Sequence, residues 1–353
     1  MTANLLQESA DAITAKRIEI MQEIIEASNL AVSSGYNSYQ LQKCREDTLY
    51  NLQFLVEALI MESDSLWKEY IRWLKFLLLS LGLNKEGLAQ HFLIIIQVVA
   101  KYIPASQFPK VDLLCLLAHD IMLTDEIPST SSLDVKNPYY AQAQQYKDLL
   151  LTAKKQEALQ LIEGLADSHI SIRNIFLDIL QPVQREIGNL WHANKISVAQ
   201  EHYSTGLTQL SMARLYPRLF NAEPKKYNMV AACVSGELHE LGLRMVTDIM
   251  EMEGWDTCFL GANTPNDAII QTILERKADL MAISVTFALN LHKAEALISK
   301  IRSNSELQHV KIMVGGYPFL HDGNLWKRIG ADSFATDASL AAKIAVSLVE
   351  NLV

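Results

Sequence analysis

Five short apolar runs in the last third of the chain limit the fold most strongly. They are "MVAACVS", "DTCFLG", "DLMAISVTF", "VKIMVGG" and "ADSFAT", between residues 229 and 336. Each run has the length of one strand, and each is followed by a helical stretch of roughly ten residues or more. This alternation predicts a parallel sheet with helices on both faces over residues 227–353.

The rest of the chain has the periodicity of helices. Stretches such as "EDTLYNLQFLVEALIM" place apolar residues three and four positions apart, which predicts an N-terminal all-α domain over residues 1–123. The segment "TDEIPSTSSLDVKNP", residues 124–138, has the composition of a linker. Residues 139–222 predict a second helical domain, a small bundle with breaks at Pro182 and at "HANKIS". The protein is therefore expected to be multidomain.

Composition and charge exclude several classes of function. Thirty-one basic and forty acidic residues give a net charge of -9, and no block of Lys and Arg stands out, so direct nucleic-acid binding is not expected. The apolar stretches "FLLLSLGL" and "FLIIIQVVAKYI" are too short to span a bilayer, and the start of the chain lacks a signal-type segment. We therefore expect a cytoplasmic protein that binds no membrane. Its four cysteines lack metal-binding spacing and are expected to be reduced thiols: Cys44, Cys115, Cys233 and Cys258.

The segment "SGELHELG" follows the first predicted strand and carries Glu237 and His239. In parallel sheets, ligands bind beyond the carboxyl ends of the strands, where the strand order reverses. Glu237 can accept the proton of one ring nitrogen of His239 and leave the other nitrogen for a metal. Gly236 and Gly242 are expected at loop positions, where the missing Cβ atom would let a large ligand approach the backbone. Taken alone, the motif also fits a surface histidine in a turn between strand and helix.

Two more strand ends carry polar or very small residues, "SVT" and "GGYP". With "SGELHELG", this pattern over residues 227–353 resembles the cobalamin-binding domain of the methionine synthase and methylmalonyl mutase families. The resemblance implies an α/β flavodoxin-like (Rossmann-like) fold in which His239 is the lower axial cobalt ligand and Glu237 its hydrogen-bond partner. Most members have Asp in place of Glu237. The cofactor's nucleotide tail would lie in a slot lined by small or polar residues, with Gly242 also at the cofactor: Ser284, Thr286, Gly315 and Gly316.

The helical bundle carries a second motif in "LWHANKISVAQEHYS". Trp191 and His192 are expected in the last turn of one helix, and Glu201 and His202 in the first turns of the next, which Ser197 begins with a capping box. Each residue alone also fits a plain core or solvated position. In this order and spacing, however, they resemble photoreceptors of the CarH type, whose bundle caps the upper face of adenosylcobalamin.

That resemblance implies a role for each of the four residues. Trp191 would pack against the adenosyl group, and Glu201 and His202 would contact it. His192 would coordinate the cobalt ion after light breaks the cobalt–carbon bond.

The N-terminal domain lacks the basic recognition helix with which those repressors bind DNA. Its segment "CREDTLYNLQFLVEALIMESDSLWKEYIRWLKFLL" resembles globin-like helical sensor domains, and the whole architecture resembles the photocobilins, which implies biliverdin as a second chromophore. No bilin-binding residue can be assigned. His91 and His119 are the only histidines of this domain, and a histidine in an apolar helix is usually a satisfied core residue.

Three functions are compatible with these observations. The leading hypothesis is a light sensor, not an enzyme, that uses adenosylcobalamin and can add biliverdin, and that signals as a homo-oligomer, a dimer or tetramer. The alternative is a corrinoid protein that carries a methyl group between methyltransferases. A third is a structural adaptor without a cofactor.

Overall fold

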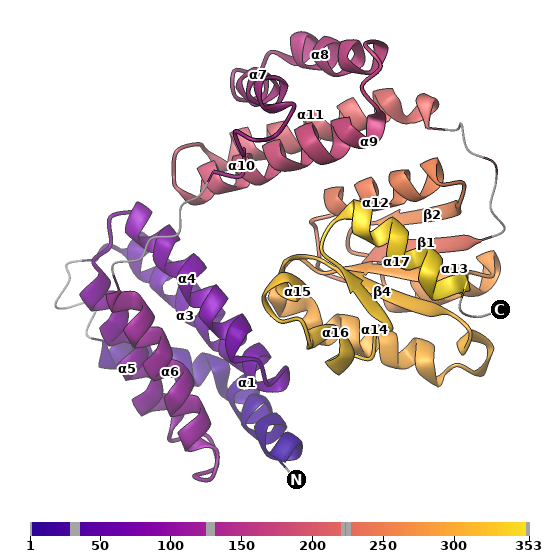
Figure 1. Ribbon diagram of the computed structural model, residues 1–353. Coiled ribbons are helices and arrows are strands. Elements are labelled where there is room, and N and C mark those ends of the chain that lie inside the picture. The colour runs from indigo at the N-terminus through magenta and orange to yellow at the C-terminus, as the bar shows by residue number, and fades with distance from the viewer. Residues whose placement is uncertain (1, 29–35, 125–130, 220–222, 224–226, 351–353) are drawn as a thin grey trace. The chain divides into compact units, whose positions relative to one another are not determined.

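A computed structural model describes residues 2–28, 36–124, 131–219, 223 and 227–350. The chain forms two compact units, Met1–Pro128 and Ser129–Val353 (Figure 1). Each unit is described by itself. No helix among the described residues has both the length and the apolar composition that a membrane span requires.

The N-terminal unit is helical, as predicted. Helix α1 packs along α3, α5 packs along α6, and α4 contacts α6. A buried aromatic cluster fills the centre: Trp67 and Phe92 are almost fully buried, and Tyr70 stacks on Phe54 with ring centroids 3.6 Å apart. The helices of this unit are α1 (Thr2–Ala27), α3 (Ser38–Ile60), α4 (Asp64–Ser80), α5 (Lys85–Val99) and α6 (Phe108–Leu123).

Both histidines of this unit have polar partners, as expected for structural residues. His91 Nε2 lies 3.4 Å from the Thr48 hydroxyl, and burial lowers the pKa of His91 to about 4. His119 Nδ1 lies 2.9 Å from Asp120 Oδ1. The four cysteines are unpaired, and Cys115 and Cys233 are fully buried.

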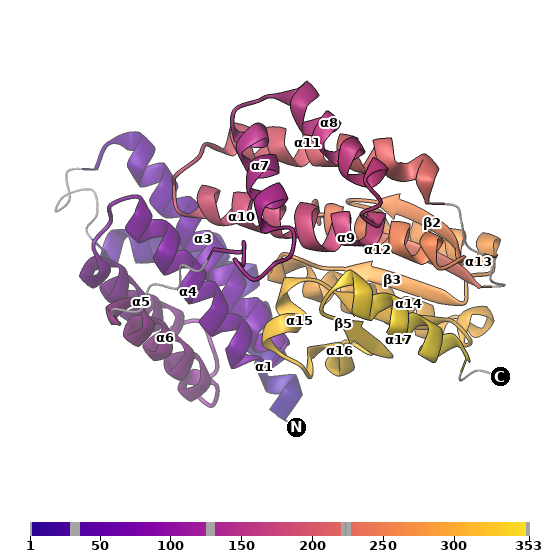
Figure 2. The ribbon, with the colours of Figure 1, turned by 45° about the horizontal axis from the view of Figure 1, so that its top comes forward.

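The second unit begins with a helical bundle (Figure 2). Its elements are α7 (Tyr140–Leu151), α8 (Lys155–Asp167), α9 (Ile172–Asn174), the π-helix η1 (Ile175–Leu180), α10 (Gln181–His192), α11 (Val198–Leu215) and the 3₁₀ turn η2 (Tyr216–Arg218). Elements α9, η1 and α10 follow one another without a gap and form one continuous helix.

The predicted break at Pro182 was therefore wrong. Proline has no N–H, so the carbonyl of Asp178 one turn earlier loses its usual helical donor. The side chain of Asn137 takes this place, because its Nδ2 donates to Asp178 O at 2.5 Å. The π-helix lies directly before the proline and absorbs the irregularity without ending the helix.

The sheet confirms the predicted parallel α/β architecture. Five strands pair in parallel in the order β2-β1-β3-β4-β5. Helices α12 and α17 lie side by side over the sheet (Figure 1). The strands are β1 (Asn228–Cys233), β2 (Asp256–Gly261), β3 (Leu280–Ser284), β4 (Lys311–Gly315) and β5 (Ser333–Ala335). The helices are α12 (Leu241–Met252), α13 (Asn266–Arg276), α14 (Leu291–Ser303), α15 (Tyr317–His321), α16 (Leu325–Arg328) and α17 (Ala338–Glu350), with 3₁₀ turns η3 (Ala288–Asn290) and η4 (Ser305–Leu307).

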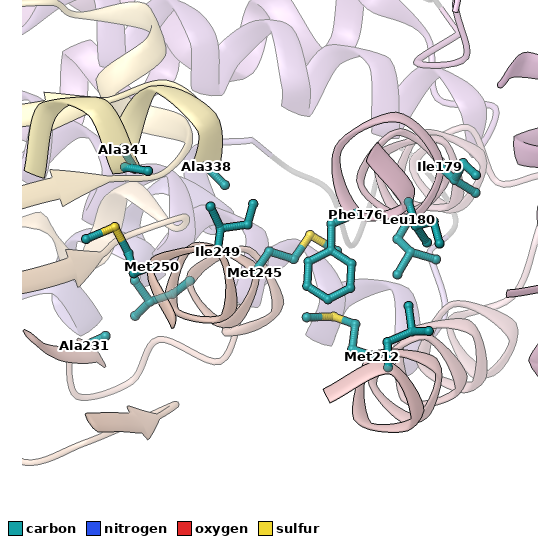
Figure 3. Packing of buried hydrophobic residues seen from close by; sticks show 14 of the residues in the cluster. Phe176, Ile179, Leu180, Met212, Ala231, Met245, Ile249, Met250, Ala338 and Ala341 are labelled. Carbon is teal, nitrogen blue, oxygen red and sulfur yellow. The ribbon is translucent and has the colours of Figure 1, made fainter. Parts of the chain in front are cut away.

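The bundle and the sheet domain share one hydrophobic core. Phe176 and Met212 of the bundle lie against Met245 of α12, and the same cluster continues through Ile249 to Ala338 of α17 (Figure 3). Burying these side chains stabilises the two parts together by the hydrophobic effect. The bundle is thereby packed on the side of the sheet that α12 and α17 cover.

Candidate functional site

The strand order reverses next to β1, because β2 pairs with one edge of β1 and β3 with the other. In a parallel sheet, the connections that follow the two strands at such a switch point run in opposite directions. They leave a crevice at the carboxyl ends of these strands. Glu237 follows β1 and Thr286 follows β3, so both lie at this crevice. The site predicted from "SGELHELG" is thus placed where ligands of this fold class bind.

The carboxylate of Glu237 accepts five hydrogen bonds although its side chain is fully buried. Its Oε1 accepts from the backbone N–H of His239 at 3.0 Å and faces His239 Nδ1 at 2.5 Å. Its Oε2 accepts from the backbone N–H groups of Thr286 and Phe287 at 2.9 and 2.8 Å and from Asn290 Nδ2 at 3.2 Å. Glu237 therefore connects the loop that follows β1 to the loop that follows β3.

These hydrogen bonds keep the carboxylate ionised. Burial alone would raise the pKa of Glu237, but donation from the ring of His239 and from the N–H groups of Phe287 and His239 outweighs it and lowers the pKa to about 2. An ionised carboxylate only accepts hydrogen bonds, so Nδ1 of His239 must be the donor. The hydrogen bond to Glu237 in turn raises the pKa of His239 against the effect of burial.

This arrangement leaves Nε2 of His239 as the ring nitrogen for a ligand. The side chain of His239 is 65% exposed, whereas that of Glu237 is 0% exposed. Among the described residues, no group of three or more His, Cys, Asp and Glu side chains gathers as for a metal ion. The site therefore offers one oriented imidazole, which suits a metal whose other ligands come from a cofactor.

Sequence reasoning missed two residues that support Glu237. Asn290, 4% exposed, donates to Glu237 and accepts from Lys293 Nζ at 2.9 Å. Lys293 lies beside Gly236, where a Cβ atom would come within 2.6 Å of the ammonium group, and the φ of Gly236 is +82°. Polar residues six and nine positions after the end of β3 would have been the available signal, but no motif marks them.

The predicted slot residues differ in what the fold asks of them. Gly316 has φ +115°, and a Cβ atom there would lie 1.9 Å from the carbonyl oxygen of Val285, so only glycine fits. At Gly315, by contrast, a Cβ atom would meet Ala335 O at an ordinary 3.4 Å. The expectation that Gly242 is a loop residue was wrong, since it is the second residue of α12, where a Cβ atom would meet open space.

The remaining slot residues lie at the end of β3. Ser284, the last residue of the strand, is buried at 8% exposure. Thr286 is half-buried and contacts Glu237 through its backbone N–H. The residues predicted to line the slot therefore lie at or just after the ends of β3 and β4.

Large apolar side chains are exposed at the same sheet edge. Leu238 follows β1, Phe287 follows β3 and Tyr317 follows β4, with exposures of 71%, 36% and 48%. Exposed apolar groups around a polar centre are typical of a ligand or partner surface. The sequence analysis missed these residues, because an isolated apolar residue in a loop carries no periodic signal.

The second predicted motif lies at one end of the bundle. Trp191 and His192 end α10, and Ser197 begins α11 with the predicted capping box, in which its hydroxyl accepts from the N–H of Gln200. Glu201 and His202 follow in the first turn of α11, and their side chains lie 2.5 Å apart. All four predicted residues therefore gather around the turn between the two helices.

Helix α11 also faces the loop of His239. The charge of Glu201 contributes to the raised pKa of His239, after the larger effects of Glu237 and burial. Further along α11, Gln209 Nε2 donates to Glu240 Oε1 at 3.0 Å, and Glu240 Oε2 accepts from the N–H of Ala262 at 2.8 Å. Glu240, another residue that sequence reasoning missed, thus joins the bundle to the strand ends.

Two protein-family models match this unit. Residues 227–343 match the model described as a B12 binding domain, and residues 142–216 match a second model with the same description. These matches support a cobalamin-binding protein. Cobalamin binding, first inferred from the residues after β1, is thereby supported for both the sheet and the bundle.

The second unit is similar to curated corrinoid proteins of Methanosarcina acetivorans. Monomethylamine corrinoid protein 1 is 25% identical over 198 residues, which cover 54% of this chain and 89% of the relative. Dimethylamine corrinoid protein 3 is 26% identical over 207 residues, covering 57% of this chain and 93% of the relative. The names of these relatives describe corrinoid proteins, which agrees with the prediction that the chain is not itself an enzyme.

A solved structure shows the same fold. The monomethylamine corrinoid protein of Methanosarcina barkeri superposes with a TM-score of 0.54 at 20% sequence identity, covering 60% of this chain and 99% of that chain. Residues 1–141 lie outside both family matches. The globin-like character of the N-terminal unit, its binding of biliverdin and the photoreceptor function therefore stay predictions.

Proposed function

We propose that the chain binds cobalamin with His239 as the lower axial ligand and works as a corrinoid protein that carries a methyl group to or from partner methyltransferases. The single observation that carries this proposal is the Glu237–His239 pair at the switch point. The names of the relatives, methylamine corrinoid proteins, favour the carrier role. Bound cobalamin would supply a cobalt ion that accepts and releases an alkyl group.

The residues of the site fit such a cofactor. Glu237 fixes the ring of His239 so that Nε2 is presented outward. A carboxylate commonly orients a metal-ligating histidine in this way, through a hydrogen bond to its other ring nitrogen. Asn290 donates to the second carboxylate oxygen of Glu237, and Lys293 in turn donates to Asn290. The exposed Leu238, Phe287 and Tyr317 offer apolar surface to a large macrocycle.

The nucleotide tail of the cofactor would occupy the slot between the ends of β3 and β4. Gly316 supports this assignment because its backbone approaches Val285 more closely than any side chain would allow. Ser284 and Gly315, the last residues of β3 and β4, have a small side chain or none and so leave space for the tail. The open space beside Gly242 at the start of α12 adds room for the macrocycle.

Uptake of hydroxocobalamin by the purified protein tests the proposal. In the cobalt(II) form, electron paramagnetic resonance should show splitting by one nitrogen ligand, and labelling the protein's histidines with the heavy nitrogen isotope should change that splitting. His239→Ala should remove this response. The matched control is His309→Ala, because His309 is an exposed histidine two residues before β4, at the end of the strand that lies away from the proposed site. An isotope effect that survives in His239→Ala would exclude the assigned ligand.

The bundle tip favours a second function, a light sensor that binds adenosylcobalamin. Trp191 and His192 lie at the same end as Glu201, whose charge acts on His239. In this role Trp191 would cover the adenosyl group, with Glu201 and His202 in contact with it, and His192 would replace that group at the cobalt ion after illumination. A methyl carrier needs an accessible upper face, whereas a sensor needs a covered one.

Absorption spectra of the adenosylcobalamin-loaded protein before and after green light separate the two functions. A sensor should give a lasting spectrum with two histidine ligands, and His192→Ala should lose it while still releasing the adenosyl group. A spectrum that is the same in the parent and in His192→Ala would remove His192 from this role. A visible band after expression with biliverdin would establish the N-terminal unit as a second chromophore domain.

A further inference from the structure

Residues 131–139, here called the strap, lie along the continuous helix of α9, η1 and α10. At one end, the Ser131 hydroxyl and the Ser132 N–H both donate to Glu186 Oε2, at 3.0 and 2.7 Å. Asn189 Nδ2 donates to the Ser132 hydroxyl at 2.9 Å. These contacts lie within two turns of His192, the last residue of α10. The segment predicted as a linker is thus anchored to the helix that carries the cap motif.

The other end of the strap is anchored nearer the start of the same helix. Asn137 Nδ2 donates to the carbonyl of Asp178 at 2.5 Å, and Asn174 Nδ2 donates to the Tyr139 hydroxyl at 3.3 Å. Between the two anchors, the side chain of Leu133 is 6% exposed and belongs to the hydrophobic core that the bundle and the sheet domain share. The strap therefore follows the helix over most of its length.

The two anchors lie on opposite sides of an irregular point in the helix. The π-helix Ile175–Leu180 and Pro182 interrupt the regular backbone ladder, and helices bend at such places. Asn137 binds before Pro182, and Ser131 and Ser132 bind after it. A bend at Pro182 must therefore change the distance between the anchors, so the strap cannot keep both sets of contacts unchanged.

We propose that the strap couples the cobalamin site to the N-terminal helical unit. This inference rests on the proposed cobalamin site and on the second proposed function, in which Trp191 and His192 lie over the cofactor. Occupation of that space displaces the end of α10, the helix bends at Pro182, and the contacts of Ser131 and Ser132 with Glu186 change. Because the strap is the first described segment after residue 124, we expect the change to be felt in residues 36–124 as well.

Hydrogen exchange of the full chain, with and without hydroxocobalamin, tests this coupling. In the parent protein, the cofactor should change exchange in the strap and in residues 36–124. The double variant Glu186→Ala/Asn189→Ala removes the anchor near the cap. It should take up cobalamin as the parent does, lose protection of the Ser132 amide about tenfold, and show no cofactor response in residues 36–124. Arg185→Ala, an exposed substitution on the same helix, is the matched control and should respond like the parent.

The outcomes separate the two proposals. A parent protein that takes up no cobalamin would overturn the proposed function and this coupling with it. Uptake without any change in residues 36–124 would overturn the coupling alone, as would an equal change in the double variant. Asn189→Ala by itself removes one anchor at an exposed position and replaces the double variant if that fails to fold. In that variant the response of residues 36–124 should be reduced, and a full response would count against the strap.

Discussion

Two buried carboxylates of the sheet domain have pKa values shifted in opposite directions. Glu237 and Asp248 are 0% and 1% exposed. Glu237 accepts five hydrogen bonds, and its pKa falls to about 2. Asp248 accepts from Arg244 Nε at 2.7 Å, but its Oδ2 meets no hydrogen-bond partner in the described part of the chain, and burial raises its pKa to about 6. Equal burial therefore gives opposite shifts, and the hydrogen-bond donors decide the sign.

The two carboxylates differ in how completely their oxygens are hydrogen-bonded. Around Glu237, the backbone of two strand-end loops and the side chains of His239 and Asn290 supply donors. Asp248 lies on α12, and its partner Arg244 also lies over the rings of Tyr216 and Phe259. That arginine serves the packing of the bundle end against the sheet domain as well as the charge. Satisfaction of every lone pair, rather than burial, marks the functional carboxylate.

Replacing Glu237 should have the largest effect. Glu237→Ala leaves the buried donors of Thr286, Phe287 and Asn290 without their acceptor, and we expect the free energy of unfolding to fall by about 3–5 kcal/mol. Urea denaturation measures this loss. Glu306→Ala, at an exposed position, should stay within about 0.5 kcal/mol of the parent. A loss below about 1 kcal/mol for Glu237→Ala would mean that water replaces the carboxylate.

Acid should separate the two carboxylates next. The folded-state pKa of Glu237 lies below its ordinary value of 4.5, so its contribution is present above pH 4.5 and is lost as the pH falls toward 2, by on the order of 3 kcal/mol. Urea midpoints at pH 5 and pH 3 measure this loss. Glu237→Gln should be far less stable at pH 5 but should change little more between the two values. An equal loss of stability in both proteins would assign the acid sensitivity to other groups.

Asp248→Asn should act in the opposite direction. Because the folded-state pKa of Asp248 is raised from 3.8 to about 6, its ionised form opposes folding, and this cost appears as the pH rises through that interval. Removing the charge should stabilise the protein at pH 7 by about 1 kcal/mol, less than the shift alone suggests because Arg244 loses its partner. The gain should vanish below pH 3.8. Asp267→Asn, an exposed control, should show no such pH dependence.

Lys293→Met should have the smallest effect on stability. Lys293 is partly exposed, so we expect a change within about 0.5 kcal/mol. Its contact with Asn290 nevertheless helps to hold Glu237, and the fraction of cobalamin ligated by His239 should fall a few-fold, less than the roughly 10- to 100-fold typical of direct partners. Lys300→Met, two turns further along α14, is the control. Equal ligation in both variants would reduce Lys293 to a surface residue.

The sequence predicted the sheet and the position of His239, because both depend on local pattern. Apolar runs and a polar motif after the first strand are visible in any window of the chain. Asn290 and Lys293 were missed because they act across the switch point, about fifty residues from Glu237. The helix through Pro182 was missed for the same reason, since the donor that replaces the proline N–H comes from Asn137. Local signals locate elements, whereas distant partners complete them.

The separation between Glu237 and its partners also has a consequence during synthesis. The donors of Thr286, Phe287 and Asn290 lie 49, 50 and 53 residues after Glu237. A ribosome that adds about 5–20 residues per second needs several seconds to produce them. Until then the glutamate belongs to a nascent chain without its switch-point crevice, and β1 has no partner in β3. The oriented imidazole therefore forms only after Asn290 has been translated, and a cofactor that binds it must load after that point.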